Sequence, residues 1–371
     1  MGASLGFIPG FLATTLSDDL GVSRGKIGLI VGIYFGATGI GSIPAGRLTD
    51  KFGARKVVVL NMLLVASSSV LIAILSTYSI WIVASVLAGM GYALANTGTN
   101  VAIGNTVPLR RRALAMSIKT SGVPLMATVA AAIGPWAANV WSWQTILVIN
   151  AIIATATGLV AYFVLDDDRM EATSSTSTHP LPRGFYWFGI AAFLLIGGSQ
   201  PLYSWTVSYL EESLNASAGL SGGIMAIASF TGVIMMICNG VWADKLGALK
   251  RIPLIMILLS VSSLSVIMVI LGTTLGTFTV IIGLTLGIST QLAAIGTMHA
   301  AVIDIAPLSI GKATGITMTG YYLGALVTPA GFGVLVDITD TYLYSWLATL
   351  AILVSAIAAW QRAGKIQSQL S

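Results

Sequence analysis

Apolar stretches of about 20 residues follow one another along almost the whole chain, and this feature restricts the possible folds more than any other. A stretch of that length, folded as an α-helix, crosses a hydrocarbon core of about 30 Å. The pattern predicts an all-α polytopic membrane protein. Twelve spans can be counted, over residues 2–16, 26–46, 57–76, 79–104, 113–137, 144–165, 185–208, 220–242, 252–272, 276–303, 313–336 and 342–360.

The composition agrees with this class. Of the 371 residues, 56% are hydrophobic and 8% are charged, whereas a soluble domain carries about 25% charged residues, so a soluble enzyme is excluded. A transmembrane β-barrel would show alternating segments of about 10 residues instead of continuous apolar runs. The net charge of +5 lies in short loops and not in one basic patch, which argues against a nucleic-acid partner.

The first span is too short to cross the hydrocarbon core of a membrane. Its roughly 15 residues would rise only about 22 Å as a helix, and we expect a truncated or misassigned start. Neither a basic leading segment nor a small-residue cleavage site is present, so a cleaved signal peptide is not expected.

Basic residues gather in the loops on one side of the expected membrane, and only Arg24 and Lys26 lie on the other. Lysine and arginine are retained on the cytoplasmic side, so both termini are expected in the cytoplasm, with the chain in the inner membrane. The basic residues on that side are Arg47, Lys51, Arg55, Lys56, Arg110, Arg111, Arg112, Arg169, Arg183, Lys245, Lys250, Arg251, Lys312, Arg362 and Lys365.

One long polar segment divides the spans into two sets of six. Residues 166–184 begin with three aspartates and continue with a Ser/Thr-rich and proline-containing stretch, which cannot build a core. We expect a cytoplasmic linker there, between bundles at 1–165 and 185–371, with a short cytoplasmic tail at the end.

The single cysteine, Cys238, excludes an internal disulfide and a cysteine-based metal site, and no metal or cofactor is expected.

A short segment recurs in the second half. Residues 46–56 read GRLTDKFGARK and residues 240–250 read GVWADKLGALK, so glycine, aspartate, lysine and glycine repeat at an offset of 194. Gly46 and Gly240 would let helices approach closely, while Gly53 and Gly247 permit the positive φ that a short turn needs. The aspartates offer interaction with helix termini.

This repeated turn resembles the motif between helices 2 and 3 of the major facilitator superfamily, and the span number and linker position resemble that family too. The resemblance implies two pseudo-symmetric six-helix bundles around a central cavity, working by alternating access. It also implies that Asp50, Arg55, Asp244 and Lys250 hold a cytoplasmic gate, together with Lys56 and the glycines of the motif. An ordinary basic turn would explain the arginines and lysines alone, but not the repeated glycines and aspartates.

Lys119 lies inside the fifth predicted span, about 10 Å beyond Arg112 along a helix. Ionisable residues within spans are costly and are therefore candidates for function. Facing a water-filled cavity, the Lys119 ammonium would attract a carboxylate or a similar anion. The alternative is that Lys119 extends to the cytoplasmic interface or pairs with a loop carboxylate.

His299 and Asp304 end the tenth span. Two such titratable groups near the pathway could form a proton relay. By the family resemblance, Asp304 instead pairs with Lys250 or Arg251 as part of the gate, whereas His299 lies deeper and either lines the cavity or packs between helices. Other polar and aromatic groups near span centres could complete a binding site, although any one of them is more often a hydrogen-bond partner between helices. These are Tyr34, Asn96, Asn100, Gln200, Tyr203, Gln291, Tyr321 and Tyr322. Trp141, Trp143 and Trp346 are expected as interfacial anchors.

Two departures from the resemblance weigh against proton-driven drug efflux. Ser85 stands about where the family's drug antiporters carry an arginine, and residues 134–138 read GPWAA in place of their glycine-rich signature.

The leading hypothesis is a secondary transporter that takes up a small organic anion, with Lys119 as the counter-charge. A proton or another ion is the expected coupling partner, and a monomer is the expected oligomeric state. The alternatives are efflux of neutral or amphipathic compounds and a non-transporting membrane sensor. An intramembrane enzyme is not expected, because no catalytic set is present. No phosphate-binding loop is present either, so ATP is not expected to drive the protein directly.

Overall fold

The structure is a computed structural model that describes residues 2–22, 24–165 and 180–368. The regular structure of these residues is entirely helical, which confirms the predicted all-α class. Two short 3-10 helices, η1 (Leu109–Arg111) and η2 (Ala248–Lys250), precede α6 and α10. The α-helices are α1 (Ser4–Phe11), α2 (Ala13–Leu20), α3 (Arg24–Phe52), α4 (Ala54–Leu75), α5 (Tyr78–Thr106), α6 (Arg112–Val140), α7 (Trp143–Val164), α8 (Tyr186–Leu214), α9 (Ala218–Leu246), α10 (Arg251–Leu275), α11 (Thr277–Ile305), α12 (Ile310–Thr339) and α13 (Leu343–Ser368).

The helices from α3 to α13 are long, with 22 to 30 residues each. Each therefore rises at least about 33 Å, enough to cross a bilayer. Within the described residues, nine helices are both long and apolar enough to be membrane spans. The multi-pass membrane class is confirmed, although the predicted number of twelve spans is not reproduced.

The first predicted span, residues 2–16, is not one short helix as predicted. It is divided into α1 and α2 by Leu12, which leaves the helical conformation while its amide donates to the carbonyl of Ile8. Pro9 lies inside α1 and has no amide proton to donate, which weakens the helix just before this break. Hydropathy alone does not register such a break, because both pieces are apolar at the junction.

Most helix ends coincide with residues suited to leaving or starting a helix. Gly247 (φ 86°) follows α9 and Gly276 (φ 102°) follows α10, both in a region that favours glycine. Ser142 and Ser217 precede α7 and α9, and each side chain accepts the backbone N–H three residues later at 3.3 Å. The helices are therefore terminated by local chemistry that the sequence carries.

The contacts divide the chain into two compact units. Unit 1 comprises Met1–Thr106, Gly122–Pro180 and Leu308–Thr319, and unit 2 comprises Val107–Ser121, Leu181–Pro307 and Gly320–Ser371. The first residues of α6 thus belong to unit 2 and the first residues of α12 to unit 1, whereas the sequence halves predicted above are 1–165 and 185–371. The predicted linker, 166–184, lies outside the described residues as far as residue 179. The division into two folding domains stays a prediction.

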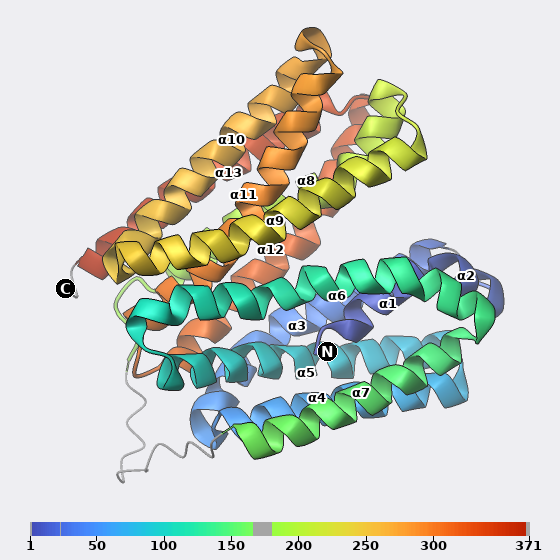
Figure 1. Cartoon of the computed structure of the whole chain (residues 1–371), viewed down its shortest axis with the longest axis vertical. Helices are drawn as coiled ribbons and strands as arrows, with labels where there is room; N and C mark the ends of the chain where they lie inside the picture. The colour runs from blue at the N-terminus through green and yellow to red at the C-terminus, as the bar shows by residue number, and fades with distance from the viewer. Residues whose placement is uncertain (1, 23, 166–179, 369–371) are drawn as a thin grey trace. The chain divides into compact units, whose positions relative to one another are not determined.

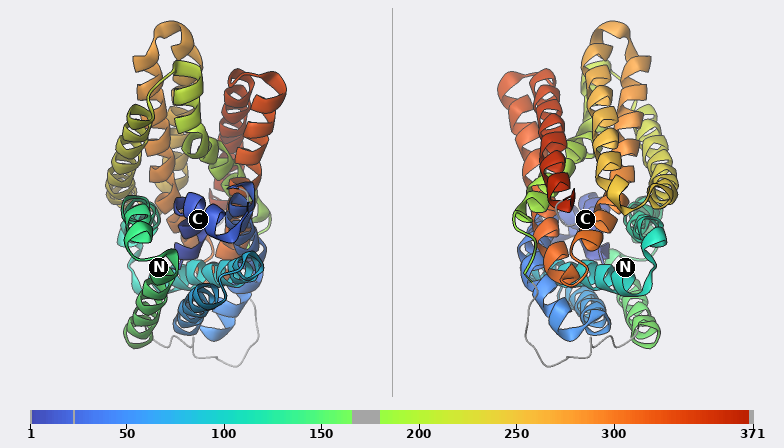
Figure 2. Two further views of the ribbon diagram at one scale, coloured as in Figure 1. Left: turned by 90° about the vertical axis from the view of Figure 1, so that its right-hand side faces the viewer. Right: turned by 90° about the vertical axis from the view of Figure 1, so that its left-hand side faces the viewer.

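Each unit is built from neighbouring long helices. In unit 1, α4 packs against both α5 and α7, and α5 packs against α3 (Figure 1). In unit 2, α10 packs against α11 and α13, and α13 packs against α8 (Figure 2).

The core of unit 1 contains two large indoles. Trp81 and Trp143 are almost fully buried, with ring centroids 6.1 Å apart, and the Trp143 indole N–H donates to the Asp19 carboxylate at 2.6 Å. The expectation that Trp143 and Trp346 are interfacial anchors is wrong, because both are 1% exposed, whereas Trp141 is 52% exposed. Asp19 of α2 and the ring of Trp81 hold Trp143 in the core, and the rings of Tyr209 and Phe332 pack against Trp346.

Unit 2 has an aromatic cluster at the turn between α12 and α13. Tyr342 lies in this turn, against the rings of Tyr209 and Phe332, and its hydroxyl donates to the Glu212 carboxylate at 2.8 Å. Burial of the hydroxyl, and then the hydrogen bond to Glu212, raise the pKa of Tyr342 above its ordinary value.

The raised pKa of Tyr342 makes stability fall at high pH. Below about pH 10 the phenol is protonated in both the folded and the unfolded chain, and above it the unfolded chain loses the proton first, so the folded state loses about 1.4 kcal/mol per pH unit. We expect Tyr342→Phe to lessen the drop in melting temperature between pH 9 and pH 11. Tyr344→Phe, at a half-exposed residue two positions along, is the control and should retain the drop; equal curves for wild type and Tyr342→Phe would contradict the assignment.

Small residues bring α8 and α12 together within unit 2. A Cβ placed on Gly320 would overlap the backbone carbonyl of Gly189, and one on Gly324 would overlap that of Phe193. Backbone cannot yield as a flexible side chain does, so both positions require glycine for this close approach.

Gly320→Ala should therefore destabilise the protein by about 1–3 kcal/mol, because the two helices must separate. Gly331→Ala on the same helix is the matched control, since a Cβ there meets open space and alanine favours a helix over glycine by up to about 1 kcal/mol. Thermal unfolding of both variants in detergent checks this. A Gly320→Ala melting temperature at or above that of Gly331→Ala would refute the packing argument.

Candidate functional site

The first copy of the repeated turn joins α3 to α4 in unit 1. Gly53 makes the turn with φ 83°, and Asp50 lies less than one helical turn before the end of α3. One oxygen of its carboxylate accepts the backbone N–H of Gly311 at 2.8 Å, and the other accepts that of Lys312 at 2.9 Å. Both donors belong to the first turn of α12, where backbone N–H groups have no partner within the helix. Asp50 therefore caps α12 and places negative charge at its positive end.

The second copy does the same in unit 2. Gly247 makes the turn with φ 86°, and the two oxygens of Asp244 accept the backbone N–H groups of Ala113 and Leu114, both at 2.9 Å. These donors lie in the first turn of α6. The sequence repeat is thus a repeat of structure, in which each aspartate holds the start of a helix from the other half of the sequence.

A buried ion-pair network surrounds Asp244 in unit 2. Arg251, at the start of α10, is fully buried and donates to Asp244 at 2.7 Å, to Asp304 at the end of α11, and to the carbonyl of Leu109 at 2.7 Å. Arg112 donates to the other oxygen of Asp304 at 3.2 Å. The expected partner of Asp304 is therefore Arg251 and not Lys250, which is exposed, and Arg112 joins them. Sequence reasoning missed Arg112, because nothing local indicates that α6 begins beside α11.

In unit 1, the basic residues that follow the repeated turn make different contacts from those in unit 2. Arg55, expected to act with Asp50, points away from it: its guanidinium donates to the carbonyl of Leu165 after α7 and lies 5.7 Å from the centre of the Tyr162 ring. Lys56 is exposed. Among the described residues, every ion pair lies in unit 2.

Glycines allow the capped helices to approach their neighbours closely. In unit 1, a Cβ on Gly46 would overlap the carbonyl of Gly311. In unit 2, the Ser117 side chain of α6 lies against both Gly240 of α9 and Gly296 of α11, leaving no room for a Cβ on either. The predicted role of Gly46 and Gly240 in close helix packing is consistent with these contacts.

Three of the candidate ligand residues belong to unit 1, and each makes a hydrogen bond there. The Tyr34 hydroxyl donates to the carbonyl of Gly2 at 2.9 Å. The Asn100 amide donates to Thr314 at 3.3 Å, and that of Asn96 lies 3.6 Å from the sulfur of Met318. Asn96 and Asn100 thus join α5 to the first turns of α12, as interhelical polar residues do.

The other candidates belong to unit 2. Lys119 is partly buried on α6 and interacts electrostatically with His299, which is 4% exposed on α11. This pair lies next to the contact between Ser117 and Gly296. Two cationic or protonatable groups are thus brought together from helices that lie far apart in the sequence.

The uncharged candidates of unit 2 are more scattered. Gln291 donates to Ser262 at 2.9 Å while its carbonyl oxygen is buried without a partner, and Tyr203 shares a hydrogen bond of 3.0 Å with Ser229. The rings of Tyr321 and Tyr322 meet edge to face at 5.2 Å. Gln200, Tyr203 and Tyr321 are partly exposed.

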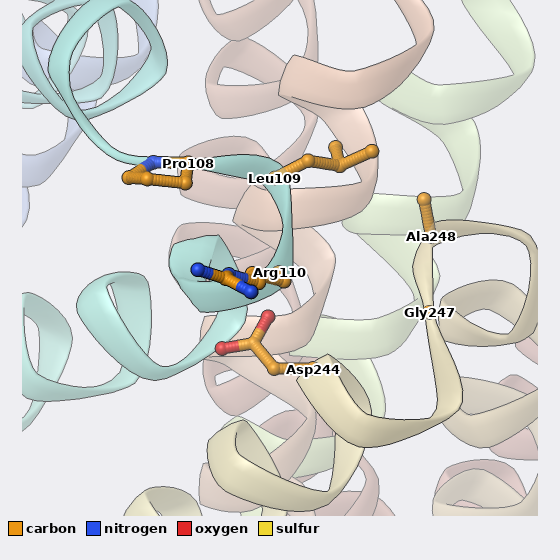
Figure 3. Close-up of a pocket in the computed structure, with 6 residues that line it drawn as sticks. All are labelled: Pro108, Leu109, Arg110, Asp244, Gly247 and Ala248. Carbon is orange, nitrogen blue, oxygen red and sulfur yellow. The ribbon is translucent and has the colours of Figure 1, made fainter.

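A cavity of about 360 Å³ lies beside the second repeat in unit 2. Pro108, Leu109 and Arg110 line it from the segment before α6, and Asp244, Gly247 and Ala248 line it from the end of α9 and the following turn (Figure 3). It is therefore next to Asp244 and not at Lys119. Within the described residues, no cluster of three or more metal-binding side chains is found.

The family model described as Major Facilitator Superfamily matches residues 1–329. The chain belongs to the major facilitator superfamily. Its fold is similar to that of the solved proton:xylose symporter XylE, with a TM-score of 0.78 and 13% identity over 96% of this chain and 92% of that one. The family resemblance of the repeated turn is thereby confirmed, and the chain is a multi-pass membrane protein of a transporter family.

Curated members of this family with similar sequences include transporters of organic anions. A gentisate transporter of Corynebacterium glutamicum is 24% identical, covering 88% of this chain and 76% of its own length. A probable sulfoacetate transporter of Cupriavidus necator is 23% identical, covering 94% and 87%. Multidrug resistance protein D of Escherichia coli is 23% identical over a shorter stretch, covering 60% of this chain and 55% of its own length.

The two capping aspartates should differ in importance for stability. Asp244→Asn removes one of the two carboxylates around buried Arg251, and breaking a buried pair costs roughly 3 kcal/mol or more. Asp50→Asn removes the favourable charge at the start of α12 and one of the two accepted hydrogen bonds, a loss of about 1–2 kcal/mol that Asp244→Asn shares. We expect the larger drop in melting temperature for Asp244→Asn, with faster hydrogen exchange in the first turn of α6.

Asp18→Asn, at an exposed residue, is the control and should change neither quantity. Equal melting temperatures for Asp244→Asn and Asp50→Asn would show that the ion-pair network adds nothing to the cap.

Proposed function

We propose that this protein is a secondary transporter that moves a small organic anion of the carboxylate type across the inner membrane by alternating access. The observation that carries the anion assignment is Lys119, a partly buried basic side chain of α6 beside His299. Intramembrane cations commonly mark substrate or ion pathways. The relatives for gentisate and sulfoacetate, both anions, support the same class.

In this proposal Lys119 binds the substrate's carboxylate, and His299 and the uncharged candidates of α8, α11 and α12 in unit 2 orient the rest of the molecule. Tyr34, Asn96 and Asn100 of unit 1 remain further candidate ligand residues. A proton or another ion couples to the substrate, and the monomer is the transporting form.

The repeated turns form the cytoplasmic gate in this proposal. Asp50 and Asp244 release the first turns of α12 and α6 when the gate opens, and Arg112, Arg251 and Asp304 separate in the same step. The concentration of basic residues in the loops at this end supports its cytoplasmic location and, with it, cytoplasmic termini.

A second candidate is efflux of neutral or amphipathic compounds, which the similarity to multidrug resistance protein D favours. In that case Lys119 has no role in recognition. Ser85, where the resemblance would place an arginine in drug antiporters, is buried, and this weighs against the candidate.

Ligand-induced stabilisation separates the two candidates, because a compound that binds the folded state raises the melting temperature. We expect gentisate or sulfoacetate, but not xylose or tetraphenylphosphonium, to stabilise the purified wild type. Lys119→Ala should weaken this effect by about tenfold to a hundredfold in concentration, as for loss of a hydrogen bond to a charged group, and Lys119→Arg should retain part of it.

Lys51→Ala, which removes an exposed lysine at the end of α3, is the control and should respond as the wild type does. Equal stabilisation of wild type and Lys119→Ala by tetraphenylphosphonium alone would sink the anion proposal and favour efflux. Uptake of the stabilising anion into proteoliposomes then tests transport directly.

A further inference from the structure

The first turns of α6 lie against the last turns of α11, and the two helices run in opposite directions. Arg112, the first residue of α6, donates to Asp304 near the end of α11. Ser117, further along α6, contacts Gly296, which comes earlier in α11. A later residue of one helix thus meets an earlier residue of the other, as in an antiparallel pair. All four residues belong to unit 2.

This register brings Lys119 and His299 to a similar depth. Lys119 comes seven residues after Arg112, a rise of about 10 Å along α6. His299 comes five residues before Asp304, a rise of about 8 Å along α11. Because the helices are antiparallel, both rises lead in the same direction from the ion pair.

The helix periodicity also turns the two side chains toward each other. Seven residues are nearly two helical turns, so Lys119 lies on the face of α6 from which Arg112 reaches α11. His299 lies three residues after Gly296, on the face of α11 that contacts α6. The electrostatic interaction between Lys119 and His299 agrees with this placement. We call these two residues the basic pair.

The basic pair lies where charges are weakly screened. His299 is 4% exposed and Lys119 is partly buried, and α11 is one of the helices long and apolar enough to span a membrane. Two positive charges side by side repel strongly in such a place, unless an anion lies beside both. Histidine ordinarily gains or loses its proton near neutral pH. An anion that reaches both groups therefore favours proton uptake by His299.

The neighbouring ion-pair network balances itself. Arg251 donates to Asp244 and Asp304. Arg112 donates to Asp304 as well, so two acids face two arginines. The remaining titratable residues of the helices α8, α9 and α10, which pack against α11, are Tyr186, Tyr203, Tyr209, Glu211 and Glu212 of α8 and Cys238 and Lys245 of α9. The network therefore adds no net charge beside the basic pair.

We propose that the basic pair binds a small organic dianion, with one acid group at Lys119 and the other at His299. His299 takes up one proton from water as the dianion binds, so that its imidazolium and the Lys119 ammonium balance the two negative charges. A monoanion is balanced by Lys119 alone and leaves His299 uncharged. The loaded site is neutral in both cases, which a weakly screened place favours.

This inference rests on the proposed function, because it places the substrate's carboxylate at Lys119. It deepens that function in two respects: the substrate has two acid groups, and the coupling ion is a proton held by His299. A site with Lys119 but without a partner for the second acid group would bind monoanions and dianions alike.

Two probes of nearly equal shape separate a one-charge site from a two-charge site. Sulfoacetate carries a carboxylate and a sulfonate, whereas methylsulfonylacetate carries the same carboxylate and a neutral methyl sulfone. Both acids are ionised from pH 6 to pH 8, because a carboxyl group titrates at about pH 4 and a sulfonate stays charged. Binding is measured from the rise in melting temperature with ligand concentration, and proton uptake by calorimetry in buffers of different ionisation enthalpy.

We expect the wild type to bind sulfoacetate about tenfold to a hundredfold more tightly than methylsulfonylacetate, as for a hydrogen bond to a charged group. Sulfoacetate should take up as much as one proton more, so its advantage should grow by as much as about tenfold per pH unit toward pH 6. His299→Gln cannot take up this proton and should bind the two probes alike, without the extra proton. A cooperative melting transition without ligand shows that this variant is folded.

Arg183→Gln removes an exposed basic residue of unit 2 and is the control, which should behave as the wild type does. Equal binding of both probes by the wild type, without extra proton uptake, would overturn the inference and leave the anion site at Lys119 intact. A preference for sulfoacetate that persists in His299→Gln would overturn the role of His299. If Lys119→Ala binds both probes as the wild type does, or if neither probe binds the wild type, the proposed function fails and the inference fails with it.

Discussion

Two carboxylates that accept backbone N–H groups at helix starts hold the arrangement together. A membrane helix satisfies its own backbone except at its ends, where the first N–H groups need outside acceptors. Asp50 supplies them to α12 and Asp244 to α6, each from the opposite half of the sequence. The close glycine contacts follow from these bonds, because a helix start can reach a carboxylate at the end of another helix only if both backbones approach closely.

The two caps are alike in geometry but unlike in electrostatics. Asp244 shares the buried guanidinium of Arg251 with Asp304, and Arg112 completes a balanced set of two acids and two bases. Around Asp50 the bonds are to backbone alone, and Arg55 turns toward α7. The same motif therefore gives a contact reinforced by buried charge in unit 2 and a simpler one in unit 1. In the proposed transport cycle, the contact in unit 2 is the more costly one to separate.

Sequence reasoning reached the fold because its signals are local. Apolar stretches set the helices, the repeated turn indicated the family, and the motif aspartates were expected at helix termini. The features that could not be predicted depend on tertiary contacts. The break at Leu12 lies within apolar sequence, and Trp143 is buried because Asp19 accepts its indole N–H. Arg55 contacts the carbonyl of Leu165 and the ring of Tyr162, far from it in sequence. For the ligand candidates, the sequence indicated residue types near span centres, and the structure adds that Lys119 lies beside His299. Their role in substrate binding stays a prediction.

The cap of Asp50 also dictates an order of events during synthesis. Its two amide donors stand 261 and 262 residues later in the chain. At a translation rate of about 5–20 residues per second, they emerge roughly 13 to 50 seconds after Asp50 itself. The Asp50 carboxylate therefore waits for its final partners until the two earlier segments of unit 2, Val107–Ser121 and Leu181–Pro307, have been made. The assembly of the first unit to enter the bilayer is completed by a segment close to the last.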